Sequence, residues 1–276
     1  MKIRKGNKHN IGAVLFLTTA STSIFAHDPN FGIGPHVLFK NGIETALETQ
    51  INQSAAQNTN IIGYQMTYGI TGNWSAGATL PYSERKNDTQ ISTGMSDIKL
   101  FTKYRFWRLD SLGVQESAAI MFAANLNNGD STTKPPLGNG ANDLVTGLTY
   151  GYESIKWYRW SSIRYRYNGE NNAGRRLGNK TLIDFVAGWR PVTPEYKKPD
   201  TVWLLELNTE ITENNTINGN KVATSGGVES FITPGIFWTY RNFAIKSGLQ
   251  LPVYRNLNNA QNKSNFRLKT TFEWHM

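Results

Sequence analysis

Residues 265–276 alternate strictly between apolar and polar side chains up to the end of the chain. Alternate positions carry Phe266, Leu268, Phe272 and Trp274, and the positions between them are charged or polar. Because successive side chains of a strand point to opposite faces, this pattern predicts a strand with one apolar and one charged face. A barrel in a bacterial outer membrane requires such a strand, since its outside meets lipid, its interior is polar and its last strand closes on the first.

Eleven further segments show strand character, so the sequence predicts an all-β fold, a closed antiparallel transmembrane β-barrel of about twelve strands. The predicted strands are 43–53, 62–70, 74–82, 97–105, 116–126, 143–153, 156–167, 181–190, 201–211, 231–240, 244–254 and 265–276. The clearest hairpin signal is Gly72-Asn73 between two alternating runs, because both residues tolerate a positive φ in a tight turn. Pro234 and Pro252 fall inside two of these segments, where each removes a ladder hydrogen bond.

The connections between the predicted strands alternate between long and short. Long polar stretches occur at 83–96, 127–142, 168–180, 212–229 and 255–264, with a shorter one at 53–60. Outer-membrane barrels place short turns in the periplasm and long loops outside the cell. An even number of strands then places both ends of the barrel at the periplasmic side.

Tryptophan gives an independent indication of the same orientation. Most of the tryptophans fall at strand ends beside short connections or at the C-terminus, namely Trp74, Trp107, Trp157, Trp189, Trp203, Trp238 and Trp274. Indole prefers the level of the lipid headgroups, so the pattern predicts an aromatic belt at one rim. A soluble sandwich would instead spread its tryptophans through a core.

The first 26 residues have a basic front, an apolar middle from Ile11 to Ala26 and a small final residue, which is typical of a secretory signal peptide. The expected division is therefore a signal peptide at 1–26, a periplasmic or lumenal arm at 27–42 and an outer-membrane barrel at 43–276. The full chain has a formal net charge of +9, and loss of four basic residues with the signal peptide would leave +5. Nucleic acid is consequently not an expected partner.

Catalysis is disfavoured because histidine is nearly absent from the predicted barrel. The chain contains no cysteine, and its four histidines are His9, His27, His36 and His275. No Ser-His or Asp-His pair is available along the predicted strands before His275. No P-loop, dinucleotide fingerprint or metalloprotease motif occurs, so neither an enzyme nor a cofactor is expected.

Charged residues at alternate positions are predicted to face the interior of the barrel. The lumen-lining candidates are Glu44, Glu48, Lys99, Lys103, Arg105, Arg164, Arg166, Asp184, Glu206, Lys246, Arg267 and Lys269. Such a mixed wall either lines a selective path for ions or solutes or forms a structural network that fills a narrow lumen. Pairing of the last strand with the first would bring Glu44 and Glu48 opposite the cations of the final segment.

Residues 27–42 allow two interpretations. After cleavage, the free amine and imidazole of His27, with Asp28 and His36, could bind copper or zinc. Alternatively the segment is an extended arm in the lumen or at the periplasmic rim, packed through Phe31, Ile33 and Phe39. The second interpretation is favoured.

The segments 66–82, 94–106 and 251–258, which read MTYGITGNWSAGATLPY, GMSDIKLFTKYRF and LPVYRNLN, resemble a family of proteobacterial outer-membrane proteins. That family is described as transporters or as proteins of the meta-pathway of phenol degradation. The resemblance covers nearly all of the mature chain, but these motifs build a barrel rather than a substrate site. It therefore implies phenolic cargo without assigning residues to it.

The sequence thus predicts a passive pore or transporter for small molecules in the outer membrane of a Gram-negative bacterium. Its expected partners are outer-membrane lipid, a small-molecule solute and the barrel-insertion machinery, although the chain ends in Met276 where insertion signals usually end in Phe. Two alternatives stay open: a metal-linked component that uses the N-terminal histidines, and a structural or adhesive barrel that works through its loops.

Overall fold

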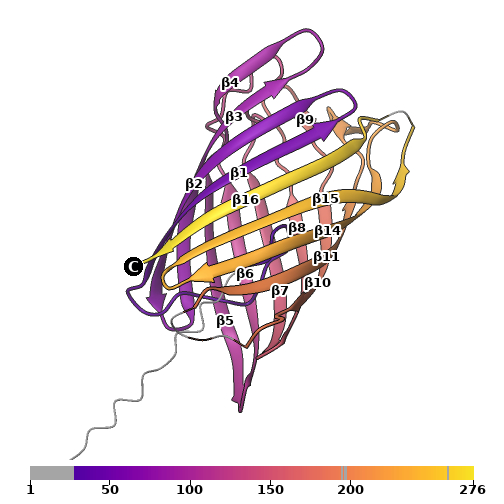
Figure 1. Ribbon diagram of the computed structural model, residues 1–276. Coiled ribbons are helices and arrows are strands. Elements are labelled where there is room, and N and C mark those ends of the chain that lie inside the picture. The colour runs from indigo at the N-terminus through magenta and orange to yellow at the C-terminus, as the bar shows by residue number, and fades with distance from the viewer. Residues whose placement is uncertain (1–27, 194, 196–197, 260) are drawn as a thin grey trace, which may run out of the picture.

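The computed structural model describes residues 28–193, 195, 198–259 and 261–276. Within these ranges, twelve long strands form a closed antiparallel barrel (Figure 1). They are β1 (Ile43–Ser54), β2 (Asn58–Thr71), β3 (Trp74–Lys86), β5 (Lys99–Ser111), β6 (Val114–Asn125), β7 (Asp143–Ser154), β8 (Trp157–Tyr167), β10 (Lys180–Trp189), β11 (Asp200–Thr212), β14 (Gly227–Tyr240), β15 (Phe243–Leu257) and β16 (Ser264–His275). The fold class predicted from the alternating pattern is confirmed.

The barrel closes where its first strand meets its last. β1 pairs with β2 along one edge and with β16 along the other, in a register that joins Glu44 to His275 and Ser54 to Ser264. Closure leaves no sheet edge in the barrel wall, as a strand-built membrane protein requires. Both ends of the barrel chain therefore lie at the same rim.

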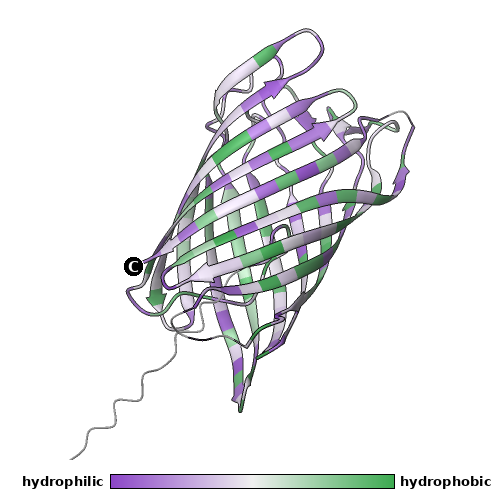
Figure 2. Cartoon of the chain, viewed as in Figure 1, coloured by the Kyte–Doolittle hydropathy of each residue, from purple (hydrophilic) through white to green (hydrophobic). Residues whose placement is uncertain are grey.

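Alternation along the strands separates an apolar outer face from an inner face that is mostly polar (Figure 2). The exception is a buried apolar cluster that includes Val186, Val202, Leu204 and Phe237. In β7, Leu144 and Leu148 are 57% and 51% exposed, whereas Asp143 and Thr149 are buried. Buried polar side chains are rare in soluble cores, but they are expected inside a membrane barrel. Apolar side chains on the outside and polar ones inside are the arrangement of an outer-membrane protein. No helix in the described residues is long and apolar enough to span a membrane.

Tryptophans gather on the outer surface near the short turns. Trp157, Trp189 and Trp203 occupy one row across three neighbouring strands, and each is about half exposed. Trp74, Trp107 and Trp274 are also exposed, whereas Trp238 is half-buried. Trp160 differs from these because its side chain is buried inside the barrel. A belt of indole rings at this rim matches the headgroup level of a bilayer.

The long connections contain short strands that the sequence pattern did not predict. β4 (Ile91–Met95) extends the hairpin begun by β3, and β9 (Arg175–Arg176), β12 (Thr216–Ile217) and β13 (Asn220–Lys221) form a small separate sheet. These segments lie beyond the barrel wall, at its long-connection end (Figure 1). An alternation of apolar and polar residues is not required there, so no pattern marks them.

Pro234 and Pro252 are both accommodated in long strands. The register between β14 and β15 shifts between Ser230 and Phe231, and Phe231 then faces Pro252. Such a bulge is a site where a strand tolerates proline. The two segments that contain proline are therefore strands, as predicted.

Candidate functional site: the lumen and its N-terminal arm

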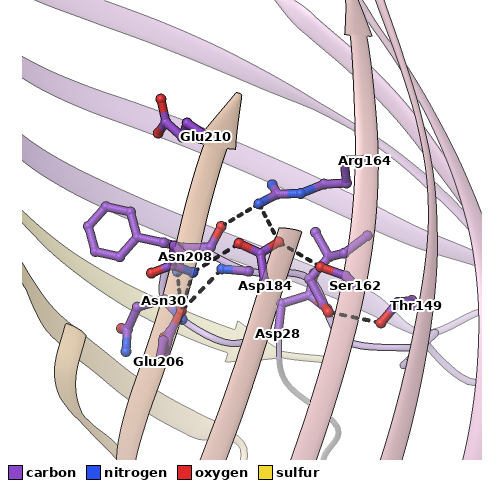
Figure 3. Close-up of polar contacts among 12 residues, drawn as sticks. Asp28, Asn30, Thr149, Ser162, Arg164, Asp184, Glu206, Asn208 and Glu210 are labelled. Carbon is purple, nitrogen blue, oxygen red and sulfur yellow. Dashed lines mark hydrogen bonds and ion pairs between the residues drawn. The ribbon is translucent and has the colours of Figure 1, made fainter. Parts of the chain in front are cut away.

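The segment 28–42, called here the N-terminal arm, precedes β1. Its residues 28–38 lie inside the barrel, and residues 39–42 lead out of the lumen into β1. The backbone or side chains of the arm contact inward-facing residues of five strands, and Figure 3 shows those of β7, β8 and β11. These residues are Lys103 of β5, Thr149 of β7, Arg164 of β8, Glu206 of β11 and Lys246 of β15. The barrel thus encloses the arm rather than carrying it at its rim.

Glu206 is the main anchor of the arm. Its carboxylate is fully buried and accepts hydrogen bonds from the backbone N–H groups of Asn30, Phe31 and Gly32, at 2.7, 3.1 and 3.2 Å. Three backbone N–H donors satisfy the hydrogen-bonding capacity of this buried carboxylate through charge-assisted bonds. The anchor therefore recognises the backbone of the arm.

Asp184 organises the wall beside this anchor. It accepts hydrogen bonds from Ser162 Oγ at 2.6 Å, from Arg164 Nη2 at 2.8 Å and from Asn208 Nδ2 at 2.9 Å. Arg164 Nη2 also donates to the carbonyl oxygen of Phe31 at 2.9 Å, so one guanidinium links wall and arm (Figure 3). Charge-assisted bonds of this kind fix geometry as well as contributing energy.

Asp28 is held at the start of the described arm. Lys103 Nζ lies 2.7 and 2.9 Å from its two carboxylate oxygens, and Lys246 Nζ donates to its carbonyl oxygen at 3.1 Å. Burial by itself raises the pKa of the Asp28 carboxyl, but the positive charges of Lys103 and Lys246 outweigh burial and hold the pKa below its usual value. Lys246 also pairs with Glu273 at 2.5 Å.

A contact with His36 explains why the side chain of Trp160 points into the barrel. His36 Nε2 hydrogen-bonds with Glu153, and Trp160 Nε1 donates to the same carboxylate at 2.6 Å. The imidazole and indole rings meet edge to face, with centroids 6.2 Å apart. Trp160 is therefore a packing partner of the arm and not part of the outer belt.

Glycines in the strands leave room for the arm. A Cβ on Gly235 of β14 would lie 2.5 Å from Asn30 Nδ2, and one on Gly248 of β15 would lie 2.8 Å from Asn30 Cγ. Gly151 of β7 is equally close to Pro35, with 2.8 Å to its Cγ. Glycine inside a strand often marks the close approach of another backbone. The wall is thus shaped to fit this segment.

Two cavities lined by described residues lie along the lumen, on either side of the arm. One, of about 110 Å³, lies toward the short turns, and the other, of about 590 Å³, lies toward the long connections. Ile33, Lys99 and Met121 line both cavities. The arm residue Ile33 therefore stands at the boundary between them. The larger cavity is called the vestibule below.

Most of the remaining lumen candidates form ion pairs along the inner wall. Lys269 Nζ is 2.8 Å from Glu48, and His275 Nδ1 is 3.4 Å from Glu44, so the junction of β1 and β16 has mixed charge. Arg166 pairs with Asp143, and Arg267 reaches Glu210 on β11. Arg105 lies at the short-turn rim, where it donates to Gly72 and Asn73.

The residues considered for metal binding do not form a cluster in the described part of the chain. His27 lies outside the described residues, Asp28 is paired with Lys103, and His36 is bonded to Glu153. Phe39, expected to pack with the arm, is 59% exposed, because the arm has left the lumen at this point to turn into β1. Metal binding at His27 stays a prediction.

One other group of possible ligands occurs in the described residues: Glu44, Glu273 and His275 have ligand atoms within 4.8 Å of one another. The ammonium of Lys246 already lies 2.5 Å from Glu273. A lysine in this position supplies the positive charge that these carboxylates require, so the group is explained by ion pairing.

Several residues that contact the arm, or that hydrogen-bond to the wall side chains around it, were not among the sequence candidates because they are neutral. They are Thr149, Ser162, Asn208, Thr233 and Gln250, together with Trp160. Strand alternation places each of them on the inner face, so the signal was present. Listing inward polar residues of every kind, rather than charged ones alone, would have found them.

Comparison with known proteins supports the fold but does not assign the chain to a family. No family model matches the chain, and no curated protein sequence matches it. Among solved structures, an outer membrane channel from Pseudomonas putida F1 is similar with a TM-score of 0.70 and 13% sequence identity, covering 91% of this chain and all of that one. The NanC porin is similar with a TM-score of 0.51 and 8% identity, covering 83% of this chain and 98% of that one. The chain therefore has the fold of an outer-membrane β-barrel.

Proposed function

We propose that this protein is a passive outer-membrane pore for small solutes, and not an enzyme. The observation that carries the proposal is the pair of cavities that meet at Ile33, Lys99 and Met121 inside a closed barrel. A barrel that served only as a scaffold would have no need of an open vestibule of about 590 Å³. The similarity of the fold to a channel and to a porin supports the same function.

In this proposal the arm sets the width of the path. It is held by charge-assisted hydrogen bonds to Glu206 and Arg164, so it stays in the lumen while solutes pass beside it. Lipid contacts the outer face, the barrel-insertion machinery places the protein in the membrane, and nucleic acid is not a partner. The long connections face the cell exterior and the short turns the periplasm.

Conductance across a planar bilayer tests the pore. The full chain, folded in detergent, should give discrete current steps in potassium chloride, and proteoliposomes that contain it should swell in small sugars faster than in large ones. Heat-denatured protein added at the same detergent concentration is the control. A folded barrel that is sealed to both ions and sugars would contradict the proposal and leave a structural or adhesive role.

The finer proposal, that the solutes include phenolic compounds, rests on the sequence resemblance and on apolar side chains in the vestibule. Met121, Val145 and Leu182 line one part of it and would accept a ring. Phenol added on the long-connection side should then reduce the ion current in a concentration-dependent way, whereas cyclohexanol, which has a ring of the same size without aromaticity, should reduce it less. Equal effects of the two compounds would contradict it.

A further inference from the structure

We propose that the vestibule is a binding site for small organic anions, which makes the pore anion-selective. This inference rests on the proposed pore function and names its substrate class. The vestibule is lined by Lys99 of β5, Arg164 and Arg166 of β8, Lys180 of β10 and Arg267 of β16. Its lining contains one carboxylate, that of Glu210. Cations converge on this space from four different strands.

The carboxylates that pair with these cations lie mostly behind them, in the wall. The Asp143 side chain is fully buried while its partner Arg166 is 34% exposed, and the Asp184 side chain is 3% exposed against 16% for Arg164. The positive ends of these pairs are therefore turned toward the vestibule. A cavity with low-dielectric walls and charges of one sign on its surface concentrates counter-ions.

Donor groups remain available for a ligand. Buried Nε atoms of Arg164 and Arg166 have no hydrogen-bond partner among the described residues. Within the same part of the chain, no carboxylate lies within 4.0 Å of the Lys99 ammonium, which is exposed to both cavities. Guanidinium and ammonium groups in this state favour carboxylate or phosphate oxygens. Among the five cations that line the vestibule, Lys99 is thus the one without a carboxylate partner in the described residues.

Size and lining indicate an organic anion rather than a bare inorganic ion. A volume of about 590 Å³ is in the range of sites for small molecules. Ile33, Met121, Val145 and Leu182 add an apolar side to the basic one. Lys99 and Ile33 also line the narrow junction with the second cavity, so an anion held here lies at the entrance to the path.

Ion selectivity tests the site without any assumption about the natural ligand. In a potassium chloride gradient across a planar bilayer, the reversal potential of the wild type should show chloride to be more permeant than potassium. The variant Lys99→Glu should lower the ratio of chloride to potassium permeability on the order of threefold. Lys156→Glu is the matched control, since Lys156 is an exposed lysine in the turn between β7 and β8. Potassium preference in the wild type, or equal effects of the two variants, would overturn the inference while leaving the pore intact.

Calorimetric titration of the full chain in detergent separates the site from the pore. Glucuronate, glucose and glucosamine share a ring size and carry charges of −1, 0 and +1. Glucuronate should bind, glucose and glucosamine should not, and binding should be lost in Lys99→Glu but kept in Lys156→Glu. Glucuronate binding without bilayer conductance would support the anion site and reject the pore. Absence of glucuronate binding by a folded, conducting barrel would reject the anion site alone.

Discussion

The two halves of the lumen handle charge in different ways. Toward the short turns, the chain neutralises its own wall: Lys103 pairs with Asp28 of the arm, Lys246 pairs with Glu273, and the neighbouring space is about 110 Å³. Toward the long connections, basic side chains border a space about five times as large, and the carboxylates that pair with Arg164 and Arg166 lie behind them. The arm fills one half and stops where the other begins.

This difference shows that a polar barrel interior need not have one role throughout. In the ion pairs that hold the arm, each charged side chain is neutralised by its partner, because a buried charge without a partner is costly. In the ion pairs around the vestibule, the cation also faces the cavity, where it can contact a solute. The predictions below test this contrast, beginning with the change of greatest expected effect.

Removal of residues 28–38 should abolish the difference between the two halves of the lumen. The two cavities would join into one wider path, and single-channel conductance should rise several-fold. Shortening the long connection 127–142 by the same eleven residues is the control, because that connection is absent from the lining of both cavities. Heat-modifiable migration on a gel verifies that each variant is folded. Unchanged conductance in a folded, armless barrel would show that the arm does not narrow the path.

Glu206 tests whether the arm is anchored at a single carboxylate. Glu206→Ala leaves three backbone N–H groups without an acceptor and should lower the free energy of unfolding by about 3 kcal/mol. Faster hydrogen exchange at Asn30, Phe31 and Gly32 should accompany the loss. Glu206→Gln keeps one acceptor oxygen and should recover part of the stability. Glu84→Ala, at an exposed position beyond the barrel wall, is the control, and an equal loss there would argue against a special role for Glu206.

Gly248 tests the fit between wall and arm. The Cβ of Gly248→Ala would lie 2.8 Å from Asn30 Cγ, so the arm would have to shift, at a cost of about 1–2 kcal/mol in the free energy of unfolding. Gly72→Ala is the matched control, because nothing lies within 4 Å of a Cβ there. Denaturant titration of both variants in the same detergent measures the difference. Two equal midpoints would mean that the arm adjusts freely.

Substitution of Glu210 tests whether the net charge at the vestibule is positive. The Glu210 carboxylate pairs with both Lys180 and Arg267, so Glu210→Gln leaves two cations without their counter-charge. Chloride permeability relative to potassium should increase by a modest factor, about twofold or less. The reversal potential in a salt gradient measures it, and a shift toward potassium would contradict the charge distribution described above.

Most of the barrel was predictable from the period of its side chains. The segment predicted at 143–153 is β7 (Asp143–Ser154), because one residue in two must face lipid. The prediction failed where this requirement ends. β3 continues to Lys86 through Glu84 and Arg85, and pairs with β4 beyond the wall. No apolar face is needed there, so the alternation of apolar and polar residues does not predict this part of the strand.

The inward-facing residues of the site could be predicted from the sequence, but the contacts among them could not. Alternation identifies Arg267 and Glu206 as inward-facing residues. It does not show that Arg267 reaches Glu210 across three strand positions of the closed wall. Nor does it show that Glu206 binds the backbone of the arm and, among the described residues, forms no ion pair with a cation. These contacts depend on barrel curvature and on a segment without a periodic pattern. The strand glycines Gly235 and Gly248 were the available signal of a close approach.

The covalent position of the arm imposes an order on assembly. The arm leads directly into β1, and β1 completes the wall only by pairing with β16, the last strand of the chain. An enclosed segment with this connectivity must already lie across the unfinished sheet when the final strand arrives, or be threaded afterwards through a finished ring. The first route needs no passage of buried charges through a narrow opening. Sealing of the wall and capture of its own N-terminal segment are then one event, so a defect in either is a defect in both.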